Sequence, residues 1–463
     1  VINAGLGTVN LVSGSKVTLN ADSEGLIQVA VDGKVLDNVY DKEGKKVEFG
    51  VDNVGEINAN GGKVYIEAEA AQDVFSKLIN QSGVVKAGSM VNKGGKIVLT
   101  SSSEGIVENS GTLDASAVEA GANGGTIEIR GEKVGQFGTV KADGLGAGGG
   151  GNVELRAAKT VALGAHSATT ANAGAEGNGG RVVVFSPDSA LMAPTAQIGV
   201  RGGDNSGNGG FVEFSGQKYV EVNGIIDRSA PHGKAGLLLI DPTDITINDA
   251  GTDDTLWTVD DWADNVGRNT SQIDIDTLIT HLLAGDTTIT TVSSGGAGSG
   301  DITLNAPGRT LTNTTAHSLT LTAERDITLS TAVDFSGSGS LNLKATRAVT
   351  LNNSVALNGG SFDSNGTSFT SGALGTITTN GGAVDLSGHS AGITIGAAIN
   401  TGGGSFTSAG TSFDNTGGTI TTAGGGIVID QTGAVIIGAA LDSGTGNVNI
   451  DAGDTLAINK PII

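Results

Sequence analysis

Five aspartates lie close together near the middle of the chain, where they could bind a metal ion. Asp253, Asp254, Asp260, Asp261 and Asp264 lie around Trp257 and Trp262. Clustered carboxylate oxygens are the ligands that Ca²⁺ prefers, but the spacing matches neither the EF-hand loop nor the calcium-binding nonapeptide repeat. Two interpretations stay open: a calcium site, or a solvated acidic loop whose tryptophans pack on the adjoining structure. No other cofactor is predicted.

Histidine is the second residue type that could carry chemistry. His166, His232, His281, His317 and His389 are far apart in the chain, and none belongs to an H-E-x-x-H motif or to a close histidine pair. A metal site or a general base would need partners at such spacings. We therefore expect the histidines to be exposed turn residues.

One stretch matches a nucleotide-binding pattern. Residues 144–149 read G-L-G-A-G-G and fit G-x-G-x-x-G. The phosphate site of that motif needs a helix directly after the glycines, whereas here a strand is expected from Asn152. The segment is predicted to be a glycine-rich corner.

Enzymes built on parallel β-helices place acidic and basic groups together on one outer face. The outward positions expected here vary in type from one repeat to the next: Tyr65, Val98, Glu128, Glu154, Val183 and Glu213. The sequence therefore does not predict an enzyme, and a β-helical polysaccharide-processing enzyme stays a minor alternative that rests on fold analogy.

The composition limits what can position these residues. The 463-residue chain has 77 glycines, 3% aromatic and 38% hydrophobic residues, so its core must be built from small aliphatic side chains. That apolar content exceeds what a disordered chain carries. The net charge of −22 argues against nucleic acid as a partner, and the absence of cysteine excludes disulfides and thiolate metal sites.

Internal repeats determine the predicted fold. A Gly-Gly pair followed by an apolar-x-apolar triplet recurs with a period of about 26 to 33 residues through the first half, and a second motif of the type Gly-Thr-Leu-Asp-Ala recurs with the same period. The Gly-Gly copies begin at Gly61, Gly94, Gly124, Gly150, Gly179 and Gly209. Period-two alternation inside each copy indicates a strand.

Strands that recur once per repeat are expected to stack as the coils of a solenoid. Ile127 and Ile129 should then lie against Val153 and Leu155, and Glu128 against Glu154, with Arg130 and Arg156 relieving the like-charge contact. We predict an all-β fold, a right-handed parallel β-helix with three strands per coil; the handedness follows from the preference of parallel crossovers.

The second half repeats with a shorter period. Residues 361–369 return at 405–413, and the expected inward positions step by seven or eight along the chain: Phe406, Phe413, Ile420, Ile427 and Val435. Each coil there should hold about 21 to 22 residues. The matching stretches 376–378 and 419–421, both Thr-Ile-Thr, also raise the alternative of a flat threonine ladder that orders ice or a crystal surface.

Three regions follow: a β-helix at 1–240 with coils of about 26 to 33 residues, a junction at 241–300, and a narrower Thr/Ser/Gly-rich β-helix at 301–463. Pro242 ends the first series because proline cannot donate a ladder hydrogen bond. In the excursion at about 250–290, a helix is expected from Ser271, as its cap, to Ala284, with Gly285 ending it.

The Gly-Gly coils and the junction at 235–247, A-G-L-L-L-I-D-P-T-D-I-T-I, resemble the filamentous-haemagglutinin family of large exoproteins, exported by the two-partner route in Gram-negative bacteria. The opening at Gly7–Leu19 is similar to the coils that follow that family's secretion module. The resemblance implies a secreted adhesive rod of the bacterial cell surface. It also implies an outer-membrane two-partner transporter as export partner, and a host-cell, neighbouring-cell or matrix ligand.

Two structural roles compete for such a rod. It could be a stalk, or the protomer of a polymeric filament that self-associates end to end, because the apolar residues at both ends of the sequence provide no obvious cap. The sequence also favours a processed or trimmed piece of a longer precursor.

Overall fold

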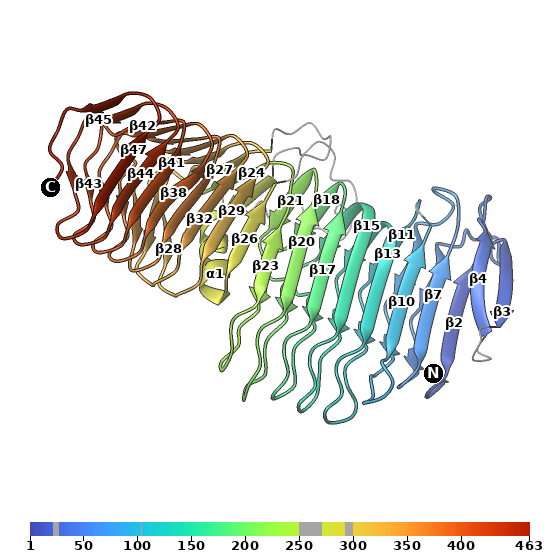
Figure 1. Ribbon diagram of the computed structural model, residues 1–463. Helices are drawn as coiled ribbons and strands as arrows, with labels where there is room; N and C mark the ends of the chain where they lie inside the picture. The colour runs from blue at the N-terminus through green and yellow to red at the C-terminus, as the bar shows by residue number, and fades with distance from the viewer. Residues whose placement is uncertain (22–26, 103, 250–270, 292–299) are drawn as a thin grey trace. The chain divides into compact units, whose positions relative to one another are not determined.

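The computed structural model describes residues 1–463 except 22–26, 103, 250–270 and 292–299. The described residues form two compact units, one running from Val1 to Leu239 and the other from Ile240 to Ile463. Both are parallel β-solenoids of three strands per coil, as the repeats predicted (Figure 1). Right-handed winding stays a prediction.

In the first unit, the Gly-Gly repeats form the first face of each coil, with strands paired in parallel to the coils before and after. Its strands are β2 (Thr8–Ser13), β7 (Lys63–Ala68), β10 (Lys96–Ser101), the first half of β13 (Thr126–Gln136), the first half of β15 (Asn152–Leu163), β17 (Arg181–Ser186), β20 (Phe211–Gly216) and β23 (Leu237–Ile240). The last residue of β23 belongs to the second unit.

The second recurring motif forms a separate eight-stranded parallel sheet, also as predicted. It contains β1 (Ile2–Asn3), β6 (Glu56–Asn58), β9 (Val84–Lys86), β12 (Thr112–Asp114), β14 (Thr139–Lys141), β16 (Ala168–Thr170), β19 (Gln197–Gly199) and β22 (Ile225–Asp227). The remaining face comprises β5 (Phe49–Asn53), β8 (Lys77–Gln81), β11 (Ile106–Asn109), the second halves of β13 and β15, β18 (Ser189–Met192) and β21 (Tyr219–Val222).

The predicted register of the first unit is confirmed. Ile127 pairs with Val153 and Ile129 with Leu155, and all four side chains are fully buried. Parallel in-register pairing places like positions above one another, so the interior is a set of aliphatic columns. Burial of these columns is the main stabilising contribution in each coil.

The Gly-Gly pairs are required by backbone packing. A Cβ atom added at Gly95 would lie 1.5 Å from the carbonyl oxygen of Ala87, and one at Gly180 would lie 2.2 Å from that of Gly151. No side chain can occupy such a position, since real Cβ contacts begin near 3 Å. Glycine therefore lets the corner of one coil close against its own coil and the coil before it.

One part of the first unit departs from the solenoid pattern. β3 (Lys16–Ala21) and β4 (Ile27–Gly33) pair antiparallel as a hairpin, whereas a parallel coil strand was expected at Lys16–Leu19. Alternating apolar residues such as Val17 and Leu19 fit either arrangement, because side-chain alternation is the same in both kinds of pairing.

The second unit has narrower coils. Phe362 pairs with Val384 and Phe406 with Ile427, so one coil takes up about 21 to 22 residues, as predicted. The first face contains β26 (Thr287–Thr290), β29 (Leu319–Ala323), β32 (Leu341–Ala345), β35 (Phe362–Gly366), β38 (Val384–His389), β41 (Phe406–Gly410), β44 (Ile427–Gln431) and β47 (Val448–Ala452). The five predicted inward residues, from Phe406 to Val435, are each at most 1% exposed.

Two further faces complete these coils. One contains β25 (Ser271–Asp274), β24 (Ile245–Asn248), β27 (Ile302–Leu304), β30 (Ile327–Leu329), β33 (Ala348–Leu351), β36 (Ser368–Ser371), β39 (Gly392–Ile395), β42 (Ser412–Asp414), β45 (Val435–Ile437) and β48 (Leu456–Ile458). The other is a seven-stranded sheet of β28 (Thr310–Asn313), β31 (Ala332–Phe335), β34 (Val355–Leu357), β37 (Ile377–Thr378), β40 (Ile399–Asn400), β43 (Ile420–Thr421) and β46 (Leu441–Asp442).

The predicted helix is shorter than expected. α1 spans Ile275–Ala284 and ends before Gly285, but its N-cap is Asp274, whose side chain accepts hydrogen bonds from the amides of Asp276 and Thr277. Ser271 is instead the first residue of β25 and pairs with Ile245. The expected cap was wrong because strand pairing extends the coil through Asp274 before the helix begins.

Candidate functional site

The positions expected to face outward in the first unit form a continuous column along the coils, but Val98 and Val183 are buried, at 7% and 0% exposed. Tyr65, Val98, Glu128, Glu154, Val183 and Glu213 follow one another in register. Lys96 lies 2.7 Å from Glu128, and Arg130 bridges Glu128 and Glu154 at 3.2 and 3.5 Å. The expected relief of the Glu128–Glu154 contact by arginine is therefore confirmed.

The column continues with the same alternation of charge. Arg156 and Arg181 lie 3.3 and 3.6 Å from Glu154, and Arg181 also reaches Glu213 at 3.3 Å. Phe185 and Phe211 provide ring faces for Arg156 and Arg181 at 5.2 and 5.4 Å. Each carboxylate is engaged by cations of the same or an adjacent coil, an arrangement that stabilises stacking. We use the name charged column for Lys96, Glu128, Arg130, Glu154, Arg156, Arg181 and Glu213.

An open depression of about 650 Å³ lies beside the charged column. Its floor is the succession of Gly-Gly pairs, and Asn123, Asn152 and Phe211 contribute to its walls. The motif at 144–149 lies in a nearby corner, in which Gly146 has a φ of 65°, and the strand β15 begins at Asn152 as expected. A helix N-terminus for phosphate is thus missing from this described segment.

The structure does not test the proposed calcium ligands. Asp253, Asp254, Asp260, Asp261 and Asp264 lie outside the described residues. Within the described ranges, no group of three or more His, Asp or Glu side chains is arranged to hold a metal ion.

Two histidines are not the exposed turn residues that were expected. His166 and His232 are exposed and His317 is partly exposed, but His281 is fully buried and His389 is 3% exposed. His281 lies on the inner face of α1, one helical turn after Leu278. His389 ends β38, and its side chain fills space in the solenoid core.

His389 contacts a serine of the preceding coil. Its Nε2 lies 3.1 Å from the hydroxyl of Ser364, and its ring lies 5.7 Å from that of Phe369. Burial lowers the pKa of His389 to about 4, a shift that the Ser364 contact opposes. The pair resembles a nucleophile beside a base, but both side chains are buried, so a substrate in solvent cannot reach them.

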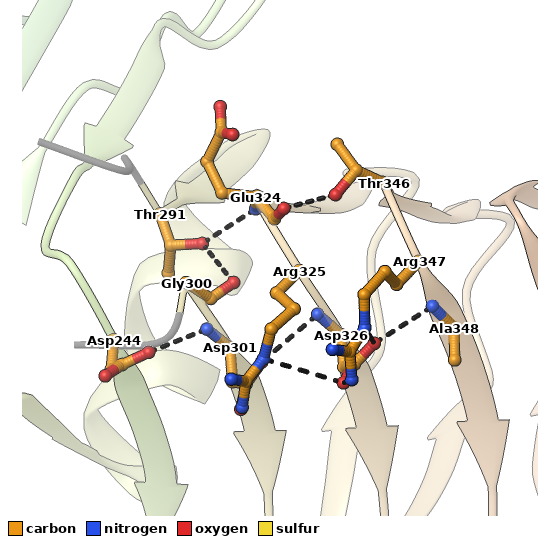
Figure 2. A network of polar contacts seen from close by, with 10 residues as sticks. All are labelled: Asp244, Thr291, Gly300, Asp301, Glu324, Arg325, Asp326, Thr346, Arg347 and Ala348. Carbon is orange, nitrogen blue, oxygen red and sulfur yellow. Dashed lines mark hydrogen bonds and ion pairs between the residues drawn. The ribbon is translucent and has the colours of Figure 1, made fainter.

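Aspartate and arginine form repeated clamps between coils at the start of the second unit (Figure 2). Arg325 binds both carboxylate oxygens of Asp301, with 2.8 Å between Nε and Oδ1, and Arg347 binds Asp326 in the same way at 3.1 and 2.5 Å. We call these two pairs the Asp–Arg clamps. The hydrogen bond with Asp301 raises the pKa of Arg325 above its ordinary range.

Each aspartate of this series also holds the backbone of the next coil. The carboxylates of Asp244, Asp301 and Asp326 accept the amides of Asp301, Asp326 and Ala348 at 2.7, 3.2 and 3.0 Å. This network was not predicted from the sequence. Asp-Ile-Thr-Leu at 301–304 recurs one coil later at 326–329, directly after Arg325, and that recurrence is a signal that could have indicated it.

Beside the clamps lies an uninterrupted row of threonines, the threonine column. It comprises Thr246, Thr303, Thr328, Thr350, Thr370 and Thr394, one from each of six successive strands. The predicted ladder at Thr378 and Thr421 is interrupted, because Asn400 lies between them in the register. A threonine array therefore exists, but on a different face from the one that the sequence suggested.

No model of a known protein family matches the chain. Comparison with curated proteins finds no relative. In the described part of the chain the one α-helix, α1, has 10 residues and is too short to cross a bilayer, which needs about 20.

Proposed function

We propose that the chain is a structural and adhesive element of the surface of a Gram-negative bacterium, exported by a two-partner transporter. The observation that carries the proposal is the use of the outward charged side chains. In both units a set of them binds neighbouring coils, namely the charged column and the Asp–Arg clamps. Such a distribution favours a scaffold over a catalyst, whose acidic and basic groups would converge on an accessible cavity.

Labelling of intact cells tests this proposal. Antibodies against the purified chain should label the surface of unpermeabilised cells that produce the full-length protein, and external protease should remove the label. Deletion of the partner transporter should abolish surface label while the protein accumulates inside the cell. Label that appears only after permeabilisation, in cells with the transporter intact, would contradict the proposal.

The two structural roles differ in the particles they form. A stalk gives discrete particles of uniform length in negative stain, whereas a polymer-forming protomer gives fibres whose length grows with protein concentration. Sedimentation velocity over a hundredfold concentration range distinguishes the two without a grid surface.

The threonine column favours a second candidate, binding to a regularly repeating surface such as ice or a crystalline polymer. Hydroxyl and methyl groups recur there once per coil, about 4.8 Å apart, over six coils. Binding by the threonine column is tested by comparing the adsorption of the parent chain and of Thr350→Lys to ice or to crystalline cellulose. Equal adsorption by the variant and the parent chain would eliminate the threonine column as the binding face.

A further inference from the structure

One interior position of the second unit changes between large and small side chains. Leu343 pairs with Ser364 of the next coil, and Leu386 pairs with Ser408, which in turn pairs with Ile429. The two serines occupy the same place in successive copies of the double repeat. Because serine is much smaller than leucine or isoleucine, each serine coil needs another side chain to fill its interior.

That side chain comes from the following coil. His389 approaches Ser364 at 3.1 Å, and the Nε2 of Gln431 donates to the hydroxyl of Ser408 at 3.2 Å. His389 ends β38 and Gln431 ends β44, so they occupy equivalent places in successive double repeats. They are 3% and 1% exposed. In both coil pairs a side chain of the following coil fills the space beside the serine. That side chain is the titratable His389 in one pair and the neutral Gln431 in the other.

Protonation would leave His389 without adequate partners. An imidazolium has two N–H donors, and no described residue accepts from Nδ1. The titratable groups on the surrounding strands are Asp363 on β35 and Asp385 on β38, both at outward positions, while β36, β39 and β41 carry none. Lys344, two coils before His389, adds positive charge, and Arg347 is engaged by Asp326.

We propose that His389 makes one coil of the second unit sensitive to acid. Protonation of its ring opens the coil formed by β38 and β39, while the coil pair joined by Gln431 and Ser408 stays closed. The inference does not depend on the proposed function. It rests on the burial of the ring, its single polar contact and the neutral counterpart one double repeat later.

The direction of the pH dependence follows from the two states. The pKa of His389 is about 4 in the folded coil and 6.5 when the coil is open. The histidine therefore imposes no penalty above pH 6.5, and stability is lost progressively as the pH falls from 6.5 towards 4. The opening equilibrium should rise about 30-fold between pH 7.5 and pH 5, and about 300-fold once the ring is charged in both states.

Hydrogen exchange measured by mass spectrometry on the full chain tests the proposal, with rates corrected for intrinsic exchange at each pH. Peptides covering 384–395 should lose protection at pH 5, while those covering 427–437 should not. His389→Gln, which copies the arrangement at Gln431, should abolish the acid response. Gln431→His should add a second acid response, in the coil of β44 and β45.

The reciprocal variants make the outcome decisive. Protection at 384–395 that is independent of pH, or an acid response that persists in His389→Gln, would overturn the proposal. If His389→Gln folds poorly, Gln431→His still decides, because a buried histidine at that site must create new acid sensitivity if the mechanism is right.

Discussion

The two units share one architecture but use different devices to close their coils. The first has coils of about 26 to 33 residues, a mainly aliphatic interior and glycine pairs at corners where backbone meets backbone. The second has coils of about 21 to 22 residues, a core that includes edge-to-face phenylalanine pairs, and the Asp–Arg clamps. A shorter coil has fewer interior positions, so each one must contribute more buried area.

Truncation of a buried side chain in the narrower core of the second unit should lower the free energy of unfolding most. Phe406 is fully buried and contacts the ring of Phe413 at 6.1 Å, so Phe406→Ala should lower the free energy of unfolding of the second unit by about 3 to 5 kcal/mol. Val153→Ala in the first unit should cost about 2 kcal/mol. Urea denaturation followed by circular dichroism checks both; equal losses would contradict the idea that interior positions matter more in the narrower coil.

Substitution of a glycine at a coil corner of the first unit should have the next largest effect on stability. Gly95→Ala should destabilise it by about 3 kcal/mol, because the new Cβ would overlap the Ala87 carbonyl oxygen. Gly94→Ala is the matched control, since only the Ser89 hydroxyl lies as near as 4.0 Å to a Cβ there, and a change within about 0.5 kcal/mol is expected. If the adjacent substitutions had similar effects on thermal stability, backbone contact would not explain the glycine pairs.

The Asp–Arg clamps should have a smaller effect. Asp326→Ala removes the acceptor of the Ala348 amide and the partner of Arg347, and we expect a loss of about 2 kcal/mol. Asp326→Asn can still accept the amide hydrogen bond and should lose about half as much. Local hydrogen exchange at 347–351 provides the measurement, and undiminished protection in Asp326→Ala would show that the clamp does not hold the next coil.

The smallest effect is expected in the charged column. The side chain of Glu154 is 19% exposed and its cationic partners 35 to 48%, so Glu154→Gln should cost only about 0.5 to 1 kcal/mol. The loss should shrink further at high salt, where screening is strong. A thermal midpoint with a salt-independent shift of several degrees would mean that the column is more than a set of surface ion pairs.

Much of the fold was predictable because the coils repeat in register. The pairing of Ile127 with Val153 and the burial of Phe406 and Phe413 follow from the period alone. The remaining face of the first unit was not identified, since strands such as Lys77–Gln81 and Ser189–Met192 have no common marker comparable to the glycine pair.

The errors concern contacts that depend on another coil. Ser271 fits a helix cap by type, yet pairing with Ile245 draws it into a strand. The burial of His389 depends on the small side chain of Ser364 in the preceding coil. The Asp–Arg clamps likewise join residues of successive coils, a separation along the chain at which residue type alone does not reveal a partner.

The Asp–Arg clamps also have a mechanical consequence. Each joins one coil to the next in addition to the backbone ladder, so a force that peels coils from the second unit in sequence meets extra resistance at the rungs from Asp301 to Arg347. The next two residues at the position of these aspartates are Ala348 and Ser368, which have no carboxylate. The coils beyond Ala348 should therefore detach at a lower pulling force. A pulled chain would then unravel from its carboxyl-terminal coils and stall at the clamped ones.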